Sequence, residues 1–396
     1  MKNIFKIKYD PKRIFGLDIL RAFAIIFVVI DHGGFLLPGN IRKITGLFAF
    51  DGVSIFFVLS GYLIGSILIR IINNNGLKIW TLLDFWIKRW FRTLPNYFLI
   101  LLILCFLNLF FAPGFTFSSV FKYFLFSQNL YTIHPGFFPE AWSLSVEEWF
   151  YLLVPIIIAV LLFFKTTNKN SIVLTSIIIV FLVTLLRFYR YSTIPIYTLS
   201  EWASIYRNQV LTRLDSLMFG VFGAYLNYYH KQLWLNHKKI CFALGICLML
   251  LSKFVIPEYT QYNDLYTTVF KLTLISIATL LLLPFLSDLR KGKGMLYKPI
   301  TLISLISYSM YLLNLSIIQD WIIKQIPWKS FIHHYYMIVV LKYMLFWILL
   351  ITLSILLFKY FEIPMTSIRE KVKVKSWFNN KMENSKKNKD NNRLIS

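Results

Sequence analysis

The sequence has few charged residues and few cysteines for its length. Only 15% of its 396 residues are charged, while 57% are hydrophobic, a balance that excludes an ordinary soluble domain. Apolar runs of about twenty residues recur along the chain, and that length crosses a lipid bilayer. The composition therefore predicts an all-α integral membrane protein that crosses the membrane several times.

The three cysteines, Cys105, Cys241 and Cys247, are scattered through apolar runs. Their odd number and wide spacing match neither a disulfide framework nor a set of metal ligands, so we expect buried packing residues. The sequence also lacks a zinc motif, a glycine-rich phosphate loop, a nucleophile elbow and a dinucleotide-binding fingerprint. No metal site and no tightly bound cofactor is expected.

Acidic residues are the scarcer charge, 18 against 42 basic ones, which gives a net charge of +24. That excess alone would permit binding to nucleic acid, but basic cytoplasmic loops explain it better in a membrane protein. Membrane lipids are therefore expected contacts, and nucleic acid is not. The first apolar run lacks a small-residue cleavage site and contains Arg21, so it is predicted to span the membrane rather than to be a signal peptide.

Ten spanning helices are predicted between turn signals such as "NNNG" and "RKGKG". They cover residues 15–32, 53–72, 95–111, 148–164, 171–189, 211–229, 240–256, 267–286, 301–323 and 335–358. With the N-terminus in the cytoplasm, the inner segments hold 28 Lys and Arg and the outer segments hold 8, which favours both termini inside. The expected organisation is a cytoplasmic segment 1–14, a membrane domain 15–364 and a basic, disordered cytoplasmic tail 365–396.

The first predicted span, "LDILRAFAIIFVVIDH", carries Arg21 and His32 eleven residues apart. Eleven residues are about three helical turns, so both side chains project from one face, about 16 Å apart along the axis. A charged residue within a span is costly and usually faces the bundle interior or a wet cavity. The alternative is that Arg21 snorkels to the inner interface while His32 lies at the outer one. His32 is suited to general-base catalysis because its unperturbed pKa lies near neutrality.

On the predicted inner side, "FWIKRWFRTLP" gathers Lys88, Arg89 and Arg92 on one short helical segment. Pro95 predicts a break or the start of the third span. Such a cluster anchors to lipid headgroups or, alternatively, clamps phosphates through bidentate arginine contacts.

On the predicted outer side, "EAWSLSVEEWFYLLVP" places Glu140, Glu147 and Glu148 just before the fourth span. The dipole of a helix favours glutamates in its first turn, which explains one of them. The functional alternative is that Glu147 or Glu148 orients His32 or balances its charge. The outer arginines Arg187, Arg190 and Arg207 indicate either a nearby acidic glycan or contact with lipid phosphates.

Three further spans carry polar residues. The second begins near Asp51 and contains Ser60 and Gly61, small residues that permit close helix packing or leave room for an acyl chain. In the sixth, Arg213 and Asp215 are two residues apart and do not face each other, so Arg213 is expected to pair with Glu147 or Glu148. The ninth has a polar stripe that interhelical hydrogen bonding explains better than catalysis. The stripe consists of Ser307, Tyr308, Ser309, Tyr311 and Asn314.

The order of these motifs resembles the membrane-bound acyltransferase-3 family, which includes bacterial O-acetyltransferases for surface polysaccharides. The segments that carry the likeness are "RAFAIIFVVIDH", "FFVLSG", "KRWFRTLP", "WSLSVEEWFYLLVP", "TRLDSLMFG" and "ISYSMYLLN". The resemblance extends from about residue 14 to residue 364 and closes with "KYFEIP".

The resemblance implies a ten-helix enzyme of the bacterial cytoplasmic membrane. Such an enzyme takes an acyl group, usually acetyl, from cytoplasmic acyl-CoA, with acetyl-CoA as the usual co-substrate. It transfers that group to a hydroxyl of an extracytoplasmic glycan such as O-antigen or exopolysaccharide. The position acylated and the participation of an acyl-enzyme stay open.

The resemblance also implies roles for individual residues. The arginine and histidine of the family match Arg21 and His32, both considered essential. Our mechanistic hypothesis is that His32 is the catalytic base, oriented by Glu147 or Glu148, while Arg21 positions the acyl donor. The implied acyl-CoA-binding residues are Lys88, Arg89, Arg92, Arg21 and Ser60, and the supporting residues are Asp51, Trp142, Ser143, Arg213, Asp215 and Tyr308. The chain departs from the family pattern at Trp149, where glutamine is frequent, at Ser304, where glycine is frequent, and at Asn314, where histidine is frequent.

Two other functions fit a bundle with intramembrane charges. One is a transporter or flippase for an anionic lipid or sugar, and the other is a non-catalytic partner in glycan assembly. Transporters often contain internal repeats or paired broken helices, and this sequence shows no such pairing. The ordered motifs favour the enzyme.

Overall fold

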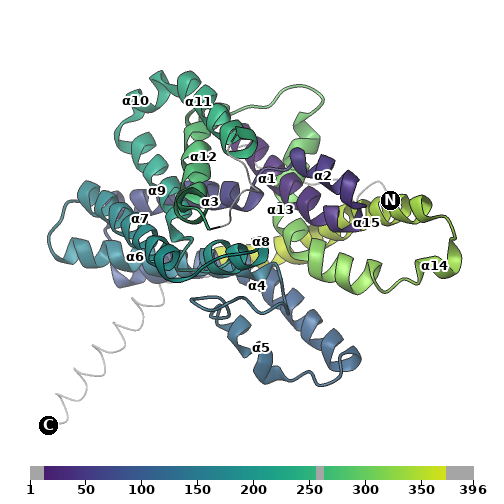
Figure 1. The fold of residues 1–396 in the computed structure, drawn as a ribbon. Coiled ribbons are helices and arrows are strands. Elements are labelled where there is room, and N and C mark those ends of the chain that lie inside the picture. The colour runs from purple at the N-terminus through teal and green to yellow at the C-terminus, as the bar shows by residue number, and fades with distance from the viewer. Residues whose placement is uncertain (1–12, 256–262, 372–396) are drawn as a thin grey trace, which may run out of the picture.

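The computed structural model describes residues 13–255 and 263–371, and every regular element in that part of the chain is helical (Figure 1). The α-helices are α1 (Phe15–Gly33), α2 (Gly39–Leu47), α3 (Gly52–Asn75), α4 (Ile79–Phe111), α5 (Phe117–Phe124), α6 (Ala141–Phe163), α7 (Asn168–Thr193), α8 (Leu199–Trp202), α9 (Leu214–Tyr229), α10 (Lys231–Asn236), α11 (Lys238–Leu250), α12 (Lys271–Asp288), α13 (Tyr297–Leu313), α14 (Trp328–Phe331), α15 (Tyr335–Leu357) and α16 (Ile363–Lys371).

Six shorter helical segments have a different pitch. One is the 3₁₀ turn η1 (Gly34–Leu36), and five are π-helical: η2 (Ala203–Arg207), η3 (Leu251–Val255), η4 (Tyr266–Phe270), η5 (Asn314–Ile323) and η6 (Phe358–Glu362). Such π-helical segments are frequent at functional sites. Here η5 continues α13, and η6 joins α15 to α16.

Eight helical stretches within the described residues are long and apolar enough to cross a membrane. They coincide with eight of the ten predicted spans, so the prediction of an all-α integral membrane protein is confirmed. The other two predicted spans, 211–229 and 240–256, fall on the shorter helices α9 and α11. The count of ten and the cytoplasmic location of both termini stay predictions.

Two predicted helix boundaries are wrong. The third span does not begin at Pro95, because α4 runs through that proline and gathers 33 residues into one helix. A proline inside a membrane helix leaves a backbone carbonyl group without its usual hydrogen bond. Neighbouring helices can supply that hydrogen bond, so the helix is able to continue. The fourth span begins at Ala141 rather than at 148, which places Glu147 and Glu148 in its second turn.

Two smaller predictions also need correction. The basic tail was expected to be disordered from residue 365, but α16 continues to Lys371; residues 372–396 lie outside the described part.

Cys105 is buried as expected, whereas Cys241 is partly exposed and Cys247 is exposed. The outer face of a membrane-spanning helix contacts lipid instead of water. A cysteine on that face is therefore not buried by other protein side chains.

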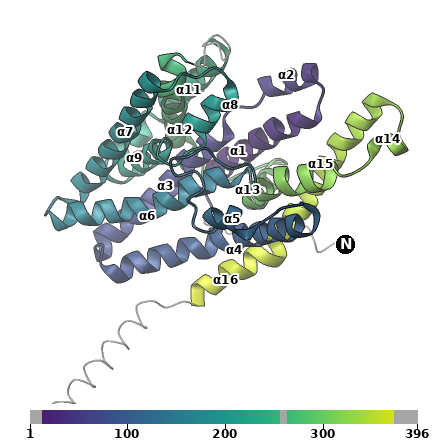
Figure 2. The same ribbon diagram turned by 60° about the horizontal axis from the view of Figure 1, so that its bottom comes forward.

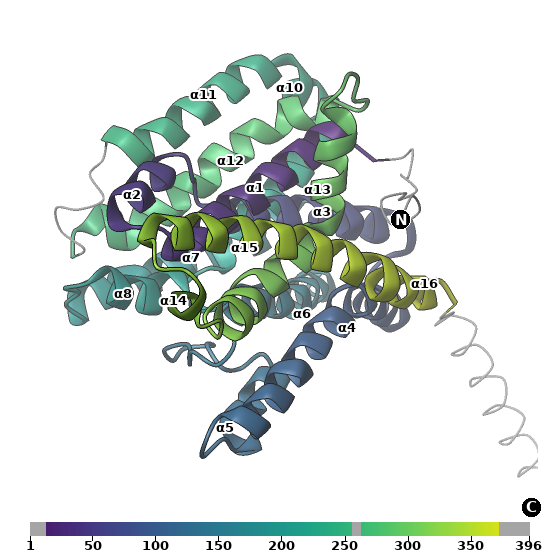
Figure 3. The ribbon, with the colours of Figure 1, turned by 90° about the vertical axis from the view of Figure 1, so that its right-hand side faces the viewer.

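Helices α1 and α3 occupy the middle of the bundle. Figure 2 shows α1 crossing the centre beside α3 and α13. In Figure 3, α1 begins and α16 ends at one end of the bundle, here called the α16 end, while α2, α8 and α14 lie at the opposite end, the α2 end. Helix α4 and the short α5 extend away from the other helices.

Helices α3 and α9 make the most extensive contact between two helices, and glycines allow it. A Cβ atom on Gly61 would lie 1.9 Å from the carbonyl oxygen of Leu217, and one on Gly220 would lie 2.0 Å from that of Val58. Small residues let membrane helices approach to backbone contact. The close-packing interpretation of Gly61 is therefore confirmed.

The substitution Gly220→Ala is expected to lower the free energy of unfolding by about 1–3 kcal/mol, because the added methyl group has no room beside α3. The control is Gly136→Ala, since no atom lies within 4 Å of a Cβ built at Gly136. The measurement is the thermal unfolding midpoint of the purified protein in detergent. Equal midpoints for the two variants would contradict this packing.

Candidate active site

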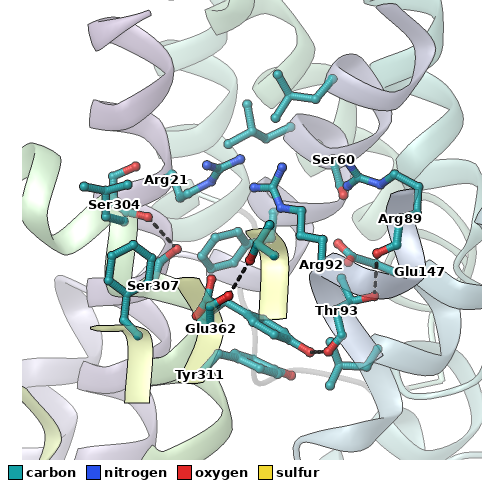
Figure 4. Close-up of a pocket in the computed structure, with 18 of the residues that line it drawn as sticks. Arg21, Ser60, Arg89, Arg92, Thr93, Glu147, Ser304, Ser307, Tyr311 and Glu362 are labelled. Atoms are coloured by element: carbon teal, nitrogen blue, oxygen red, sulfur yellow. Dashed lines mark hydrogen bonds between the residues drawn. The ribbon is translucent and has the colours of Figure 1, made fainter. Parts of the chain in front are cut away.

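A cavity of about 500 Å³ lies inside the bundle, between α1, α3, α4, α6, α13 and the η6–α16 segment (Figure 4). Its lining residues Thr366 and Ser367 belong to the α16 end, whereas Ser143 and Tyr311 lie toward the α2 end. The volume falls within the roughly 300–1,000 Å³ of small-molecule sites. The cavity thus extends along α13 from one end of the bundle toward the other.

Two arginines direct their guanidinium groups into this cavity. Figure 4 shows Arg21 from α1 and Arg92 from α4 pointing into the same space. Neither forms a hydrogen bond or an ion pair within the described part of the chain. Arg21 is half-buried and Arg92 is exposed, and the planar donors of a guanidinium match phosphate and carboxylate oxygens. The pair is therefore suited to hold an anionic ligand.

The predicted cluster of three cations is only partly assembled. Arg89 lines the cavity beside Arg92, with its guanidinium 5.2 Å from the ring centre of Tyr151. Lys88 does not line the cavity: it is exposed and forms a 2.6 Å ion pair with Asp84 one turn earlier. Successive residues on a helix point about 100° apart, and Asp84 attracts the lysine. The prediction that Lys88 joins the clamp is wrong.

Glu147 reaches the same cavity from α6. The Tyr151 hydroxyl donates a hydrogen bond to Glu147 Oε2 at 3.0 Å and lies 3.0 Å from Ser60 Oγ. Ser60 and Glu147 therefore line the same cavity as Arg21 and Arg92, here called the arginine-lined cavity, as Figure 4 shows. Glu148 points elsewhere and accepts a hydrogen bond from Thr93 at 2.7 Å.

His32 is held by Asn314, the first residue of η5. Asn314 Nδ2 donates to the carbonyl oxygens of Met310 and Tyr311 at 3.1 and 2.6 Å, so Oδ1 faces His32 Nδ1 at 2.5 Å. An amide oxygen only accepts hydrogen bonds, so Nδ1 carries the proton and Nε2 keeps its lone pair. The half-buried imidazole is therefore oriented to accept a proton at Nε2.

The prediction that Glu147 or Glu148 orients His32 is wrong, because Asn314 holds that position. The reason is the early start of α6, which carries both glutamates two turns away from the end where His32 lies. Glu140, just before α6, lies nearer. Its carboxylate accepts hydrogen bonds from the backbone N–H groups of Leu315 and Ser316 at 3.0 and 2.8 Å, and so anchors η5.

His32 does not line the arginine-lined cavity. The hydroxyl groups of Tyr311 and Ser143, 2.6 Å apart, close the cavity toward the α2 end, and the Tyr311 hydroxyl also donates to the Glu140 carbonyl oxygen at 3.0 Å. Asn314 follows Tyr311 by three residues, about one helical turn. His32 thus lies about one turn beyond the closed end.

The model of the family described as "Acyltransferase domain" matches residues 14–359, nearly the whole described chain. The chain belongs to the acyltransferase-3 family. This agrees with the arginine and the histidine on α1, with the basic motif of α4 and with the glutamate motif of α6.

The chain is similar to several curated members of this family. It is 35% identical over 163 residues to the O-acetyltransferase OatA of Staphylococcus aureus, covering 37% of this chain and 25% of that protein. It is 31% identical over 162 residues to the peptidoglycan O-acetyltransferase OatA of Listeria monocytogenes, covering 37% and 24%. A further Staphylococcus aureus protein, named provisionally as an O-acetyltransferase, is 28% identical over 396 residues, covering 94% and 59%.

The chain therefore spans about a quarter of the OatA proteins it matches and 59% of the third relative. No solved structure matches the chain.

The supporting residues taken from the family motifs divide into two groups. Asp51 caps the start of α3 by accepting hydrogen bonds from Ser54, and Arg207 lies 3.7 Å from it. Trp142 is buried with its ring face toward Arg207, 5.5 Å from the guanidinium. Arg213 was expected to pair with a glutamate of α6, but it donates to Ser54 at 2.6 Å instead. These residues build the α2 end.

Asp215 forms a fully buried ion pair with Arg187, at 2.8 Å and with both side chains 0% exposed. This confirms that Asp215 and Arg213 take different partners. Arg187 is therefore structural, and Arg190 is also buried, with its guanidinium 4.6 Å from the Tyr131 ring centre. Neither arginine can face a glycan, whereas Arg207 lines a second cavity at the α2 end.

The polar stripe on α13 makes interhelical hydrogen bonds, as expected. Tyr308 donates to the Thr93 carbonyl oxygen at 2.7 Å, and Ser309 donates to Glu362 at 2.8 Å. Ser304, at a position where the family often has glycine, donates to Asp18 at 2.7 Å. Sequence reasoning missed Glu362, a cavity-lining carboxylate, although it stands in the closing motif "KYFEIP".

The substitution Asp215→Ala is expected to destabilise the protein by about 3–5 kcal/mol, because it leaves Arg187 buried without its carboxylate partner. The control is Asp320→Ala, which breaks the exposed pair with Lys324 and should cost at most about 1 kcal/mol. Thermal unfolding in detergent measures both. If Asp215→Ala is no less stable than Asp320→Ala, the buried pair does not hold α7 against α9.

Proposed function

We propose that this chain transfers an acyl group, most simply acetyl, from acetyl-CoA in the cytoplasm to a hydroxyl of a cell-envelope glycan outside. The protein would be a multi-pass enzyme of the bacterial cytoplasmic membrane. Family membership and the names of its relatives support the reaction class. The family resemblance implies a glycan such as O-antigen or exopolysaccharide as the acyl acceptor, and the name of the Listeria relative adds peptidoglycan.

The acyl donor enters from the α16 end. This end is assigned to the cytoplasm because the predicted inner segments carry most of the Lys and Arg residues. CoA is highly anionic and cannot enter hydrocarbon, so its phosphates stay against the guanidinium groups of Arg21, Arg89 and Arg92. The uncharged pantetheine arm then lies along the cavity, past Ser60, with the thioester toward Tyr311.

The acyl group reaches His32 by passing the hydroxyl pair of Tyr311 and Ser143. His32 Nε2 removes the proton from the acceptor hydroxyl, and the hydroxyl oxygen attacks the thioester carbonyl carbon. The carbon–sulfur bond breaks, the new carbon–oxygen ester bond forms, and the CoA thiolate takes the proton from His32. Asn314 keeps the imidazole in the orientation that this proton transfer needs. No metal or resident cofactor takes part.

The observation that carries this proposal is the position of two functional groups on one helix. Arg21 faces a cavity with an unsatisfied guanidinium, and His32 lies about three turns further with Nε2 free to accept a proton. A transporter for an anionic substrate would also use Arg21 but would have no need for an oriented imidazole.

The substitution Arg92→Ala is expected to weaken acetyl-CoA binding by roughly 10–100-fold, because hydrogen bonds to charged groups contribute about 1.5–3 kcal/mol. Lys88→Ala is the matched control, since Lys88 lies one turn away on the same helix and is paired with Asp84. Isothermal titration of the purified protein with acetyl-CoA measures both affinities. Equal affinities for the two variants would exclude the arginine-lined cavity as the donor site.

The substitution His32→Ala is expected to abolish acetyl transfer while acetyl-CoA binding is kept. Asn314→Leu should lower kcat by about 100-fold, because the imidazole loses the acceptor that orients it and a general base contributes about 10²–10⁴. Transfer of radiolabelled acetyl from acetyl-CoA to extracted surface glycans measures the rate. Full turnover by folded His32→Ala would disprove the catalytic role, and transport without consumption of acetyl-CoA would indicate a flippase.

A further inference from the structure

A second cavity, of about 790 Å³, opens at the α2 end, where Asp31, the residue before His32, lines its wall. Its walls come from the end of α1, from α2, from the start of α3 and from the α8–η2 turn, with η3 and α12 completing it. Figure 3 shows α2 and α8 at this end of the bundle, opposite α16. Helix α2 has no buried residue, so one wall is a surface helix.

Cations outnumber carboxylates in the walls of this second cavity. The basic lining residues are Arg42, Lys43, Arg207, Lys253 and Lys271, and the acidic ones are Asp31 and Asp51. Asp51 already accepts a hydrogen bond at the start of α3 and forms an ion pair with Arg207. Lys253 donates to the carbonyl oxygens of Gly46 and Ala49 and so braces the wall.

The cations carried by α2 are the ones available to a ligand. Lys43 is exposed and forms no hydrogen bond or ion pair with another described residue. Arg42 is also exposed, and its guanidinium lies 4.1 Å from the ring centre of Phe35, which leaves its N–H donors unused. An unpaired ammonium and guanidinium on one short helix create a positive potential that attracts anions.

Arg207 lines the second cavity and also interacts with the residues around His32. Burial alone would lower the pKa of Arg207, but the carboxylates of Asp51 and Asp31 hold that pKa above its usual value, so Arg207 stays a cation. Its charge acts on His32 and Asp31, and its guanidinium lies over Trp142. His32 itself does not line the second cavity, but Asp31, the residue before it, does. Tyr311 and Ser143 belong to the arginine-lined cavity instead.

We propose that the second cavity binds the acyl acceptor, and that this acceptor is an anionic glycan whose acidic groups contact Arg42 and Lys43. This inference rests on the proposed acetyl transfer and adds the charge class of the substrate. Asp31 accepts hydrogen bonds from sugar hydroxyls next to the one that His32 deprotonates. A neutral sugar gains nothing from the cations of α2, so charge discriminates between acceptors.

The test offers three extracts of surface material as acyl acceptors to the purified full-length protein with radiolabelled acetyl-CoA. These are anionic glycans, neutral glycans and membrane lipids, separated by ion exchange and solvent extraction. The label is expected in the anionic glycans. Lys43→Glu should raise KM for that fraction by about tenfold, because it reverses a charge at the binding site, with KM for acetyl-CoA unchanged.

The matched control is Lys329→Glu, the same charge reversal at an exposed lysine on α14 that lies outside the second cavity; it should leave KM for the glycan unchanged. Label in the neutral glycans or in the lipids would overturn the inference, as would equal KM values for the two variants. Label in no extract, with no acetyl-CoA binding, would instead count against the proposed function itself.

Discussion

The arrangement depends on what happens to guanidinium groups inside a bundle of apolar helices. A cation taken out of water needs an acceptor, and most of the buried arginines have one within the protein: Arg187 has Asp215, and Arg213 has Ser54. Arg21, which is half-buried, and Arg92, which is exposed, instead face a cavity together, without a hydrogen bond to the described chain. Their donors are therefore left for a ligand. This contrast separates arginines that hold helices together from arginines whose donors are available to a ligand.

Helix α1 connects the two ends of the bundle. It carries Arg21 in the wall of the first cavity and Asp31, the residue before His32, in the wall of the second, and the hydroxyl pair of Tyr311 and Ser143 separates the two cavities. An enzyme that joins a cytoplasmic acyl donor to an outer acyl acceptor needs such a division, because an open channel would leak ions and CoA. The polar residues of α13 and η5 serve both sides, since Tyr311 closes one cavity while Asn314 orients His32.

Much of this could be predicted from local sequence. Hydrophobic run length gave the membrane class, and helical periodicity placed Arg21 and His32 on one face. The partners of these residues could not be predicted, because they depend on contacts between distant segments: Asn314 lies 282 residues from His32 along the chain. The glutamate motif was misplaced for a different reason. Its apolar flank predicts a span from 148, but the helix starts at Ala141, and seven residues move Glu147 from the α2 end to the arginine-lined cavity.

The central claim is that the cavity between α1 and α4 holds the acyl donor with its thioester toward His32. A cryo-electron microscopy map of the protein in lipid nanodiscs with a non-hydrolysable acetyl-CoA analogue tests it directly. The account predicts phosphate density between Arg21 and Arg92, and the pantetheine arm extending toward Tyr311. Density for the analogue in the cavity at the α2 end, or at the lipid surface with the arginine-lined cavity empty, would contradict it.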